Sequence, residues 1–255
     1  MKIMTFNLRF ENDRDGSNGW EFRKDLVVQL IDRHAPSILG TQEGTCSQIS
    51  YLRDNLPEYH LHTPNRIYDD TCQYPTLFVK RNDFVVLEGS EFWLSRTPHI
   101  HRSKDWDSAF PRMLSYGRLK SIGSGRVFSV AVTHLDHMSS NARYEQAKII
   151  IDWIHGQTGA VILMGDFNDS PASPVHNLLV EHGTGLRDTW HTLGRKDNCD
   201  SFTHHGFTGI PGKGRLDWIL ISSHIRVNDA FIIRDHWGGR FPSDHFPYLV
   251  STDHI

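Results

Sequence analysis

Cysteine is scarce in this sequence, and the few cysteines present are not arranged for cross-linking or metal binding. The 255 residues include three, Cys46, Cys72 and Cys199, and no two of them form a Cys-x-x-Cys pair. An odd number of widely spaced cysteines excludes a full disulfide framework and a cysteine-based zinc site. Nothing in the sequence therefore requires an oxidising compartment.

Long apolar runs are missing as well. No uninterrupted apolar segment approaches the roughly 18 residues of a transmembrane helix. The chain enters strand-like sequence at Lys2 without the basic segment and apolar core of a signal peptide. Taking Met1 as the natural start, we expect a cytoplasmic protein that does not associate with a membrane.

The chain also lacks an excess of positive charge and any compositionally biased stretch. Its formal net charge is −3, and 38% of its residues are hydrophobic. Proteins that hold long duplexes mainly through phosphate contacts usually carry a basic face, so this class is disfavoured, while a local basic groove stays open. With no flexible linker in the sequence, we predict one domain over residues 1–255, acting as a monomer.

Short apolar strands alternate with amphipathic helices. Strands are predicted at Lys2–Asn7 and 37–42 around a helix at 22–33, and again at 126–134 and 161–164 around a helix at Ser140–His155, which Ser140 can cap. The segment between these units favours strands at 76–80, 84–87 and 91–94. Two strand–helix–strand units in an undivided chain predict an α/β protein with two sheets packed face to face and helices outside.

Polar side chains cluster where the predicted strands end. Asp166 and Asn168 directly follow the apolar run 160–164. A carboxylate in this place can orient or deprotonate a nucleophile, and the neighbouring amide can donate a hydrogen bond to a phosphoryl oxygen. Because Asp and Asn also favour turns, an Asx-type turn without chemistry is the alternative.

Histidine occurs 17 times, so most histidines are expected to be incidental. His245 follows Asp244, and this pairing places a hard oxygen ligand beside an imidazole. His134 ends a predicted strand and can face a phosphate or simply be a polar strand terminus. Neither motif decides the function by itself.

Three further polar residues lie at strand ends. Glu43 closes the strand at 37–42, Asn7 closes the first strand, and Asp217 begins a strand near the C-terminus. Mg²⁺ prefers one or two carboxylates and several waters, so Glu43 and Asp244 with a neutral Asn7 have suitable chemistry. A buried Asp217 can orient an imidazole.

Taken in order, six motifs resemble the motif series of the endonuclease/exonuclease/phosphatase superfamily, in a bacterial branch related to deadenylases. The resemblance spans nearly the whole chain. The motifs are Thr5-Phe6-Asn7, Gln42-Glu43, Thr133-His134-Leu135, Gly165-Asp166-Phe167-Asn168, Leu216-Asp217-Trp218-Ile219 and Ser243-Asp244-His245. The resemblance implies a four-layer α/β sandwich with two central mixed, mainly antiparallel sheets, and a site at one edge of the sheets.

The resemblance also implies roles for these residues in hydrolysing a phosphate ester. Glu43 is expected to be the main Mg²⁺ ligand, with Asn7 and Asp244 near the metal and Mn²⁺ as an alternative ion. Asp166 is expected to position or deprotonate the attacking water. The phosphate would be bound by His134 and Asn168, and by His245 acting as a general base or phosphate-stabilising imidazole oriented by Asp217.

One position departs from the family pattern. Gln73 stands where many relatives have glutamate, which would deprive His134 of a carboxylate partner.

The substrate is a phosphate ester, and phosphodiesters of nucleotides or single-stranded nucleic acid are the leading expectation. Small phosphorylated metabolites or lipid headgroups are the alternative, and a non-catalytic phosphate-binding module is a second one. Aromatic side chains at the rim of a site can stack bases, although many aromatics belong to the core instead. The expected substrate-binding residues are Arg9, Trp20, Trp93, Arg118 and Phe207.

Overall fold

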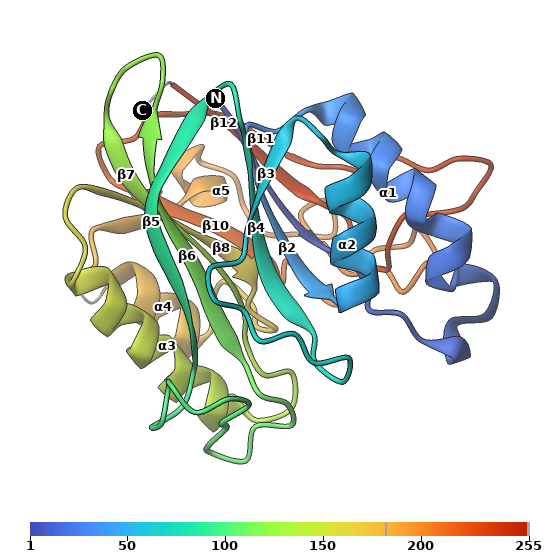
Figure 1. Cartoon of the computed structure of the whole chain (residues 1–255), viewed down its shortest axis with the longest axis horizontal. Coiled ribbons are helices and arrows are strands. Elements are labelled where there is room, and N and C mark those ends of the chain that lie inside the picture. The colour runs from blue at the N-terminus through green and yellow to red at the C-terminus, as the bar shows by residue number, and fades with distance from the viewer. Residues whose placement is uncertain (182, 254–255) are drawn as a thin grey trace.

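Two stacked six-stranded sheets form the centre of the computed structural model, which describes residues 1–181 and 183–253 (Figure 1). The first sheet has the order β11 (Val227–Ile232), β12 (Tyr248–Thr252), β1 (Lys2–Asn7), β2 (Ile38–Gly44), β4 (Tyr74–Lys80) and β3 (Tyr59–His62). The second has the order β5 (Phe84–Trp93), β6 (Met113–Ser121), β7 (Val127–His134), β8 (Ala160–Asp166), β10 (Asp217–Ser222) and β9 (Leu186–Asp188).

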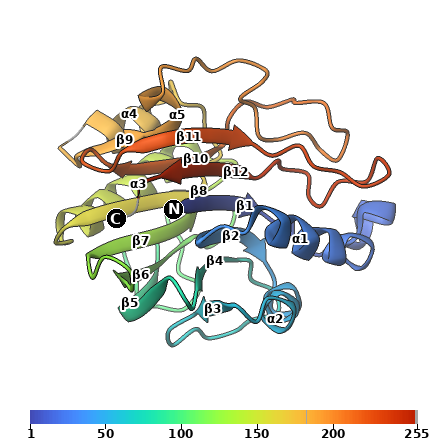
Figure 2. The same cartoon turned by 90° about the horizontal axis from the view of Figure 1, so that it is seen from above.

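Helices cover the outer faces of both sheets. Figure 2 shows α1 (Trp20–His34) and α2 (Cys46–Asn55) beside the first sheet, and α3 (Ser140–His155) and α4 (Pro174–Glu181) beside the second. A 3₁₀-helix, η1 (Asp13–Asn18), precedes α1, and the short α5 (Thr189–Thr192) follows β9. The predicted four-layer α/β sandwich is therefore confirmed. Within the two described ranges, every helix is too short or too polar to cross a membrane.

Each sheet contains one parallel pair of strands. β1 pairs parallel to β2 through the α1 connection, β7 pairs parallel to β8 through the α3 connection, and the other neighbouring strands pair antiparallel. A helical connection between parallel strands returns the chain in the same direction, so polar residues at the ends of β1 and β2 emerge at one edge. The same holds for β7 and β8.

Alternating side chains build the core between the sheets. Ile3 and Ile38 from the first sheet pack with Val130 and Ile162 from the second, and all four are fully buried. Their strand neighbours point outward, where Met4 joins the cluster under α1 and α2. The strands are thus apolar on both faces, which explains why they read as continuous hydrophobic runs.

Three local predictions were wrong. The strands expected at 84–87 and 91–94 are one strand, β5, whose register shifts between Val86 and Glu88. Ser139, not Ser140, caps α3, because its hydroxyl accepts a hydrogen bond from the Ala142 N–H at 3.1 Å. The prediction also lacked β6, which pairs with both β5 and β7.

A buried ion pair fixes the segment that enters β10. Arg215 donates to the Asp188 carboxylate at 2.9 Å, and both side chains are almost fully buried. The His176 imidazole contacts the same carboxylate at 2.8 Å. Burial alone would raise the pKa of Asp188, but the bonds from His176 and Arg215 hold it well below its ordinary value.

We expect Asp188→Asn to lower the free energy of unfolding by about 3–5 kcal/mol at pH 7, because it leaves the Arg215 guanidinium buried beside a neutral amide. The ionised carboxylate stabilises the fold above its unfolded-state pKa of about 4, and this stabilisation is lost as the pH falls towards its lower folded-state pKa. Urea titrations should show a smaller difference from the wild type at pH 3 than at pH 7.

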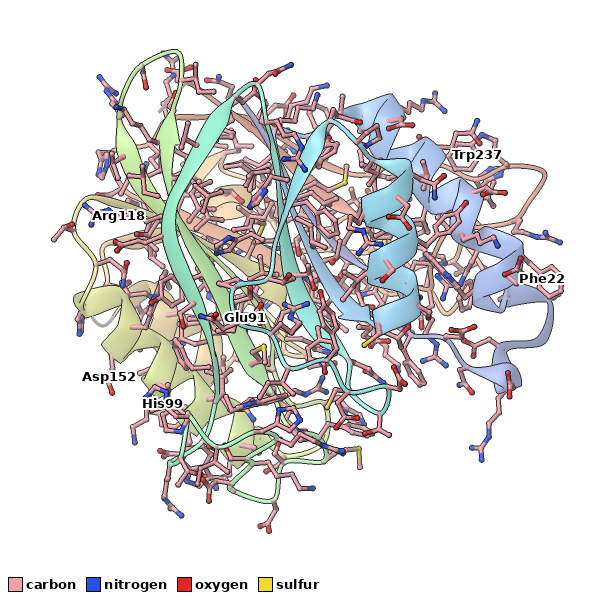
Figure 3. All side chains as sticks on the ribbon, viewed as in Figure 1. Phe22, Glu91, His99, Arg118, Asp152 and Trp237 are labelled. Atoms are coloured by element: carbon pink, nitrogen blue, oxygen red, sulfur yellow. The ribbon has the colours of Figure 1, made fainter. Side chains whose placement is uncertain are left out.

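The matched control is Asp152→Asn on the exposed side of α3, where the side chain points away from the protein (Figure 3). It should leave the unfolding free energy within about 0.5 kcal/mol. An Asp188→Asn effect as small as that of the control would contradict the assigned role of the ion pair.

Candidate active site

A cleft of about 720 Å³ opens where the polar strand ends meet. Six of the eight residues expected to be catalytic or metal-binding line it, namely Glu43, His134, Asp166, Asn168, Asp244 and His245. The other two lie directly behind these residues. Asn7 donates to Asp166 at 2.9 Å and to Glu43 at 3.2 Å, and Asp217 contacts His245 at 2.8 Å. The structure thus brings all eight together.

The buried carboxylate of Asp166 lies at the centre of this group. Its Oδ2 is 2.9 Å from the Asn7 amide nitrogen, 3.5 Å from Nε2 of His134 and 3.8 Å from Nε2 of His245. Its Oδ1 accepts a hydrogen bond from the Asn168 N–H at 2.9 Å. One oxygen therefore fixes the local turn while the other faces both imidazoles, so an Asx-type turn leaves one carboxylate oxygen available for chemistry.

The local sequence explains how Asp166 reaches this position. Gly165 has a φ of 156°, and a Cβ atom there would lie 2.1 Å from the Thr133 carbonyl oxygen. Only glycine lets β8 approach β7 so closely at the edge of the cleft. Asn168 then adopts a left-handed conformation with a φ of 50°, which asparagine tolerates better than most residues.

Glu43 is held in a less favourable backbone conformation. Its φ is 63°, and its side chain accepts hydrogen bonds from the Phe10 N–H at 3.0 Å and from Asn7. A left-handed conformation costs a non-glycine residue about 1 kcal/mol or more. The hydrogen bonds offset this cost and turn the carboxylate towards the cleft.

Burial and neighbouring charges separate the protonation behaviour of the central groups. Burial, together with the nearby Asp217 carboxylate, raises the pKa of Asp166 to about 7. Burial alone would lower the pKa of His245, but Asp217, Asp166 and Asp244 outweigh it and raise the pKa to about 10. At neutral pH His245 is therefore a cation, and Asp166 can take up or release a proton.

The second imidazole behaves in the opposite way. Burial and the Arg112 guanidinium lower the pKa of His134 well below its ordinary value. The Asn168 amide nitrogen lies 2.9 Å from Nε2 of His134, and in this assigned amide orientation it donates to a neutral ring. Gln73 lines the same cleft without contributing a charge, which is consistent with a neutral His134.

Two sets of oxygen-rich residues in the cleft have metal-binding chemistry. Asp166, Asp217 and His245 present ligand atoms within 4.8 Å of one another. A metal ion bound by these three residues would have to break the hydrogen bond between His245 and Asp217, whose side chains are 2.8 Å apart. Glu43 and Asp244 with Asn7 form the second set, whose hard oxygen atoms suit a divalent ion. We favour this set.

Outside the cleft, His176, Asp188 and His191 also form a group that could hold a metal. The Arg215 guanidinium donates to the Asp188 carboxylate at 2.9 Å and already supplies its counter-charge. This group is therefore structural.

A segment between α5 and β10 supports the site, and the sequence analysis missed it. The hydroxyl of the fully buried Thr203 accepts from the backbone N–H groups of Leu216 at 3.0 Å and Asp217 at 3.3 Å. The Thr203 carbonyl accepts from the Phe246 N–H at 2.7 Å. Thr203 thus joins the start of β10 to the chain around His245, and no periodic pattern in the sequence indicates it.

The cleft also contains residues to which no sequence motif assigned a role, among them Phe110, Met138 and Lys213. Additional lining residues are Phe10, Gln73, Phe110, Arg112, His137, Met138, His204, Lys213 and Leu216.

The structure places one of the five expected substrate-binding residues in the cleft lining and the other four elsewhere. Arg9 lines the cleft and lies 3.8 Å from Asp244. Trp20 and Trp93 are buried in the apolar cluster under α1 and α2, and Phe207 packs against the Arg23 guanidinium. Arg118 on β6 forms an ion pair with Glu88 on the neighbouring strand β5 (Figure 3). Among the described residues, only Arg9 of these five belongs to the cleft lining.

Comparisons with known proteins agree with this geometry. The sequence profile of the endonuclease/exonuclease/phosphatase family matches residues 4–245. The structure is similar to that of a mannosyl-6-phosphatase from Bacteroides thetaiotaomicron, with 28% identity, 100% of both chains covered and a TM-score of 0.89. A family protein from Bacteroides vulgatus has 30% identity and a TM-score of 0.90, with 99% of this chain and 98% of that chain covered.

A curated relative is more distant. Nocturnin from Drosophila melanogaster is 26% identical over 173 residues, which are 63% of this chain and 26% of that protein. The chain thus spans about a quarter of nocturnin. Enzymes of the matched family generally depend on a divalent metal, and the acidic and histidine side chains of the cleft can bind one. The chain belongs to the endonuclease/exonuclease/phosphatase family and is a hydrolase of phosphate esters.

Proposed function

We propose that the protein is a Mg²⁺-dependent phosphatase of small phosphorylated metabolites, with sugar phosphate monoesters as its substrate class. The observation that carries this proposal is the limited extent of the cleft, whose volume of about 720 Å³ suits a small ligand. Its cationic residues Arg9, Arg112 and Lys213 all belong to this one lining. The likeness to a mannosyl-6-phosphatase along the whole chain supports the same class.

Phosphodiesters of nucleotides or single-stranded nucleic acid are the second candidate, although the sequence alone placed them first. The order changes because Trp20, Trp93, Phe207 and Arg118 do not line the cleft. Arg9 favours this candidate, since its guanidinium lies 4.7 Å from the centre of the Phe10 ring at the cleft. A cation beside an aromatic ring can hold a phosphate next to a stacked base.

In the proposed mechanism, Glu43, Asp244 and Asn7 would hold Mg²⁺ or Mn²⁺, which would supply positive charge to the phosphoryl oxygens. Asp166 orients a water molecule for in-line attack and accepts its proton, a role that suits a pKa of about 7. The cationic His245, held by Asp217, stabilises the negative charge that develops on phosphate. When phosphate binds, His134 and Asn168 would exchange their mutual hydrogen bond for N–H groups donated to phosphate oxygens, and the leaving oxygen takes up a proton from solvent as its bond to phosphorus breaks.

A hydrolysis panel tests the proposed function. We expect the protein to hydrolyse mannose 6-phosphate and p-nitrophenyl phosphate in Mg²⁺ or Mn²⁺, with EDTA abolishing the activity. Bis-p-nitrophenyl phosphate, single-stranded DNA and RNA should be poorer substrates. Asp166→Ala should lower kcat by about a thousandfold or more, because water then loses its base and its orientation.

Other results of the panel would contradict the phosphatase and support one of the alternatives. Cleavage of DNA or RNA without cleavage of monoesters would show that the protein is a nuclease. No cleavage in any metal, and no effect of Asp166→Ala, would show that it is a non-catalytic phosphate-binding module.

The partnership of Asp217 and His245 gives a second prediction. Asp217→Asn removes the carboxylate that orients the imidazole and stabilises its charge, so kcat should fall by about 10²–10⁴-fold. The pKa of His245 should fall as well, because the negative charge of Asp217, which raises this pKa, is lost. The alkaline limb of the pH–rate profile should therefore move to lower pH, while Asp152→Asn leaves the profile unchanged.

Thr203 provides a third prediction, as a positioning residue. Thr203→Val keeps the side-chain shape but leaves the N–H groups of Leu216 and Asp217 without their acceptor. We expect kcat to fall by about 10-fold or more with a small change in KM, and Thr203→Ser to restore it. Equal activity in the valine and serine variants would refute the role.

A further inference from the structure

An exposed apolar surface lies inside the catalytic cleft. It consists of Phe110, which is 49% exposed, and Met138, which is 71% exposed, and both line the cleft. We call these two side chains the apolar shelf. Large apolar side chains at the surface are common singly, but two of them beside the reacting groups form a binding surface for part of a ligand.

The shelf has a rigid base. The fully buried carboxylate of Asp136 accepts hydrogen bonds from the Ala109 N–H at 2.8 Å and the Ser108 hydroxyl at 3.1 Å. It also accepts from the N–H groups of Met138 at 2.9 Å and Ser139 at 2.7 Å. One side chain therefore fixes the two loops that carry the shelf, so the backbone of the surface is formed before a ligand arrives.

The ring of Phe110 is oriented by its neighbours. It stacks on the His137 imidazole with the ring centres 5.7 Å apart and an interplanar angle of 23°. The Arg112 guanidinium lies 5.8 Å from the centre of the same ring and 3.3 Å from Nδ1 of His137. These contacts support the ring while leaving about half of it exposed.

The position of the apolar shelf in the cleft suits contact with the leaving group of the substrate. The chain continues from His134, which is 3.5 Å from Asp166, through two residues to His137 and Met138. The shelf thus lies on the His134 side of Asp166, while His204 and Lys213 line the cleft from the segment that packs on His245. Because the shelf lines the same cleft as both imidazoles, a phosphate held between them can extend its ester group onto the shelf.

We propose that the apolar shelf is the leaving-group subsite, where the C–H face of a single sugar ring lies against Phe110 and Met138. This inference rests on the proposed phosphatase function. A pyranose has an apolar face and a rim of hydroxyl groups, and the cleft offers polar side chains for that rim in Gln73, His137 and Lys213. Successive nucleic-acid bases would need successive stacking platforms, and the shelf offers one exposed ring.

The test compares phosphate esters that differ only in the leaving group. Phe110→Ala should lower kcat/KM for mannose 6-phosphate about tenfold or more, mainly through KM, because the ring loses its apolar contact. Activity on glycerol 3-phosphate, which has no ring, should change less than about twofold, and so should inhibition by inorganic phosphate. Met138→Ala should act in the same direction, and Phe110→Tyr should retain wild-type selectivity.

Phe22→Ala is the matched control. Phe22 is also an exposed phenylalanine, at 56%, but it lies on α1 at the far end of the protein (Figure 3). It should leave all three measurements unchanged. Equal loss on both substrates, or no loss on either, in the Phe110 and Met138 variants would overturn the subsite. A wild-type protein inactive on all monoesters would instead refute the phosphatase function, and the subsite with it.

Discussion

The carboxylate of Asp166 lies where the two sheets meet, buried and in contact with both ends of the chain. Asn7 reaches it from β1, the first strand, and His245 reaches it from the segment before β12, the last strand. A buried negative charge is costly unless hydrogen bonds and positive charge compensate for it. Asn7, Asn168, His134 and His245 all contact this one oxygen pair, and the fold thus supplies the compensation from segments that are distant in sequence.

Three groups of different charge surround Asp166: the Asp217 carboxylate, the cationic His245 and the neutral His134. Asp217 holds His245 in the charged form, while burial and Arg112 keep His134 neutral. Two histidines of the same intrinsic chemistry thus differ in charge at neutral pH. Both rings are buried, so the difference comes from the neighbouring charges: the Asp217 carboxylate contacts His245 at 2.8 Å, whereas the Arg112 guanidinium acts on His134.

Strand–helix–strand periodicity predicted two packed sheets with helices outside, and the family resemblance of the six motifs implied the four-layer sandwich and pointed to the central residues. Asp166 and Glu43 follow apolar runs directly, and parallel strands in each half bring such strand ends to one edge. The hydrogen bonds between segments that are distant in sequence could not be predicted in this way. Thr203 lies in a segment without a periodic pattern, and its importance comes from its hydrogen bonds to the backbone N–H groups of Leu216, Asp217 and Phe246.

The substrate-binding residues show the same limit. Trp20 and Trp93 are aromatic residues that were expected at the rim of the site, but their side chains contribute to the core instead. Phe110 and Met138 line the cleft because Asp136 draws two loops together, and no motif identifies that arrangement. The gathering of polar strand-end residues can thus be predicted from sequence, whereas the walls of the cleft depend on loop packing.

The central claim is that side chains from both ends of the chain surround one metal-assisted hydrolytic site at Asp166. Crystals grown with Mn²⁺ and phosphate test it most directly through the anomalous signal of the ion. We predict one strong peak bound by Glu43 and Asp244, with phosphate between His134, Asn168 and His245. A Mn²⁺ peak bound instead by Asp217 and His245, or phosphate bound only outside this cleft, would contradict the account.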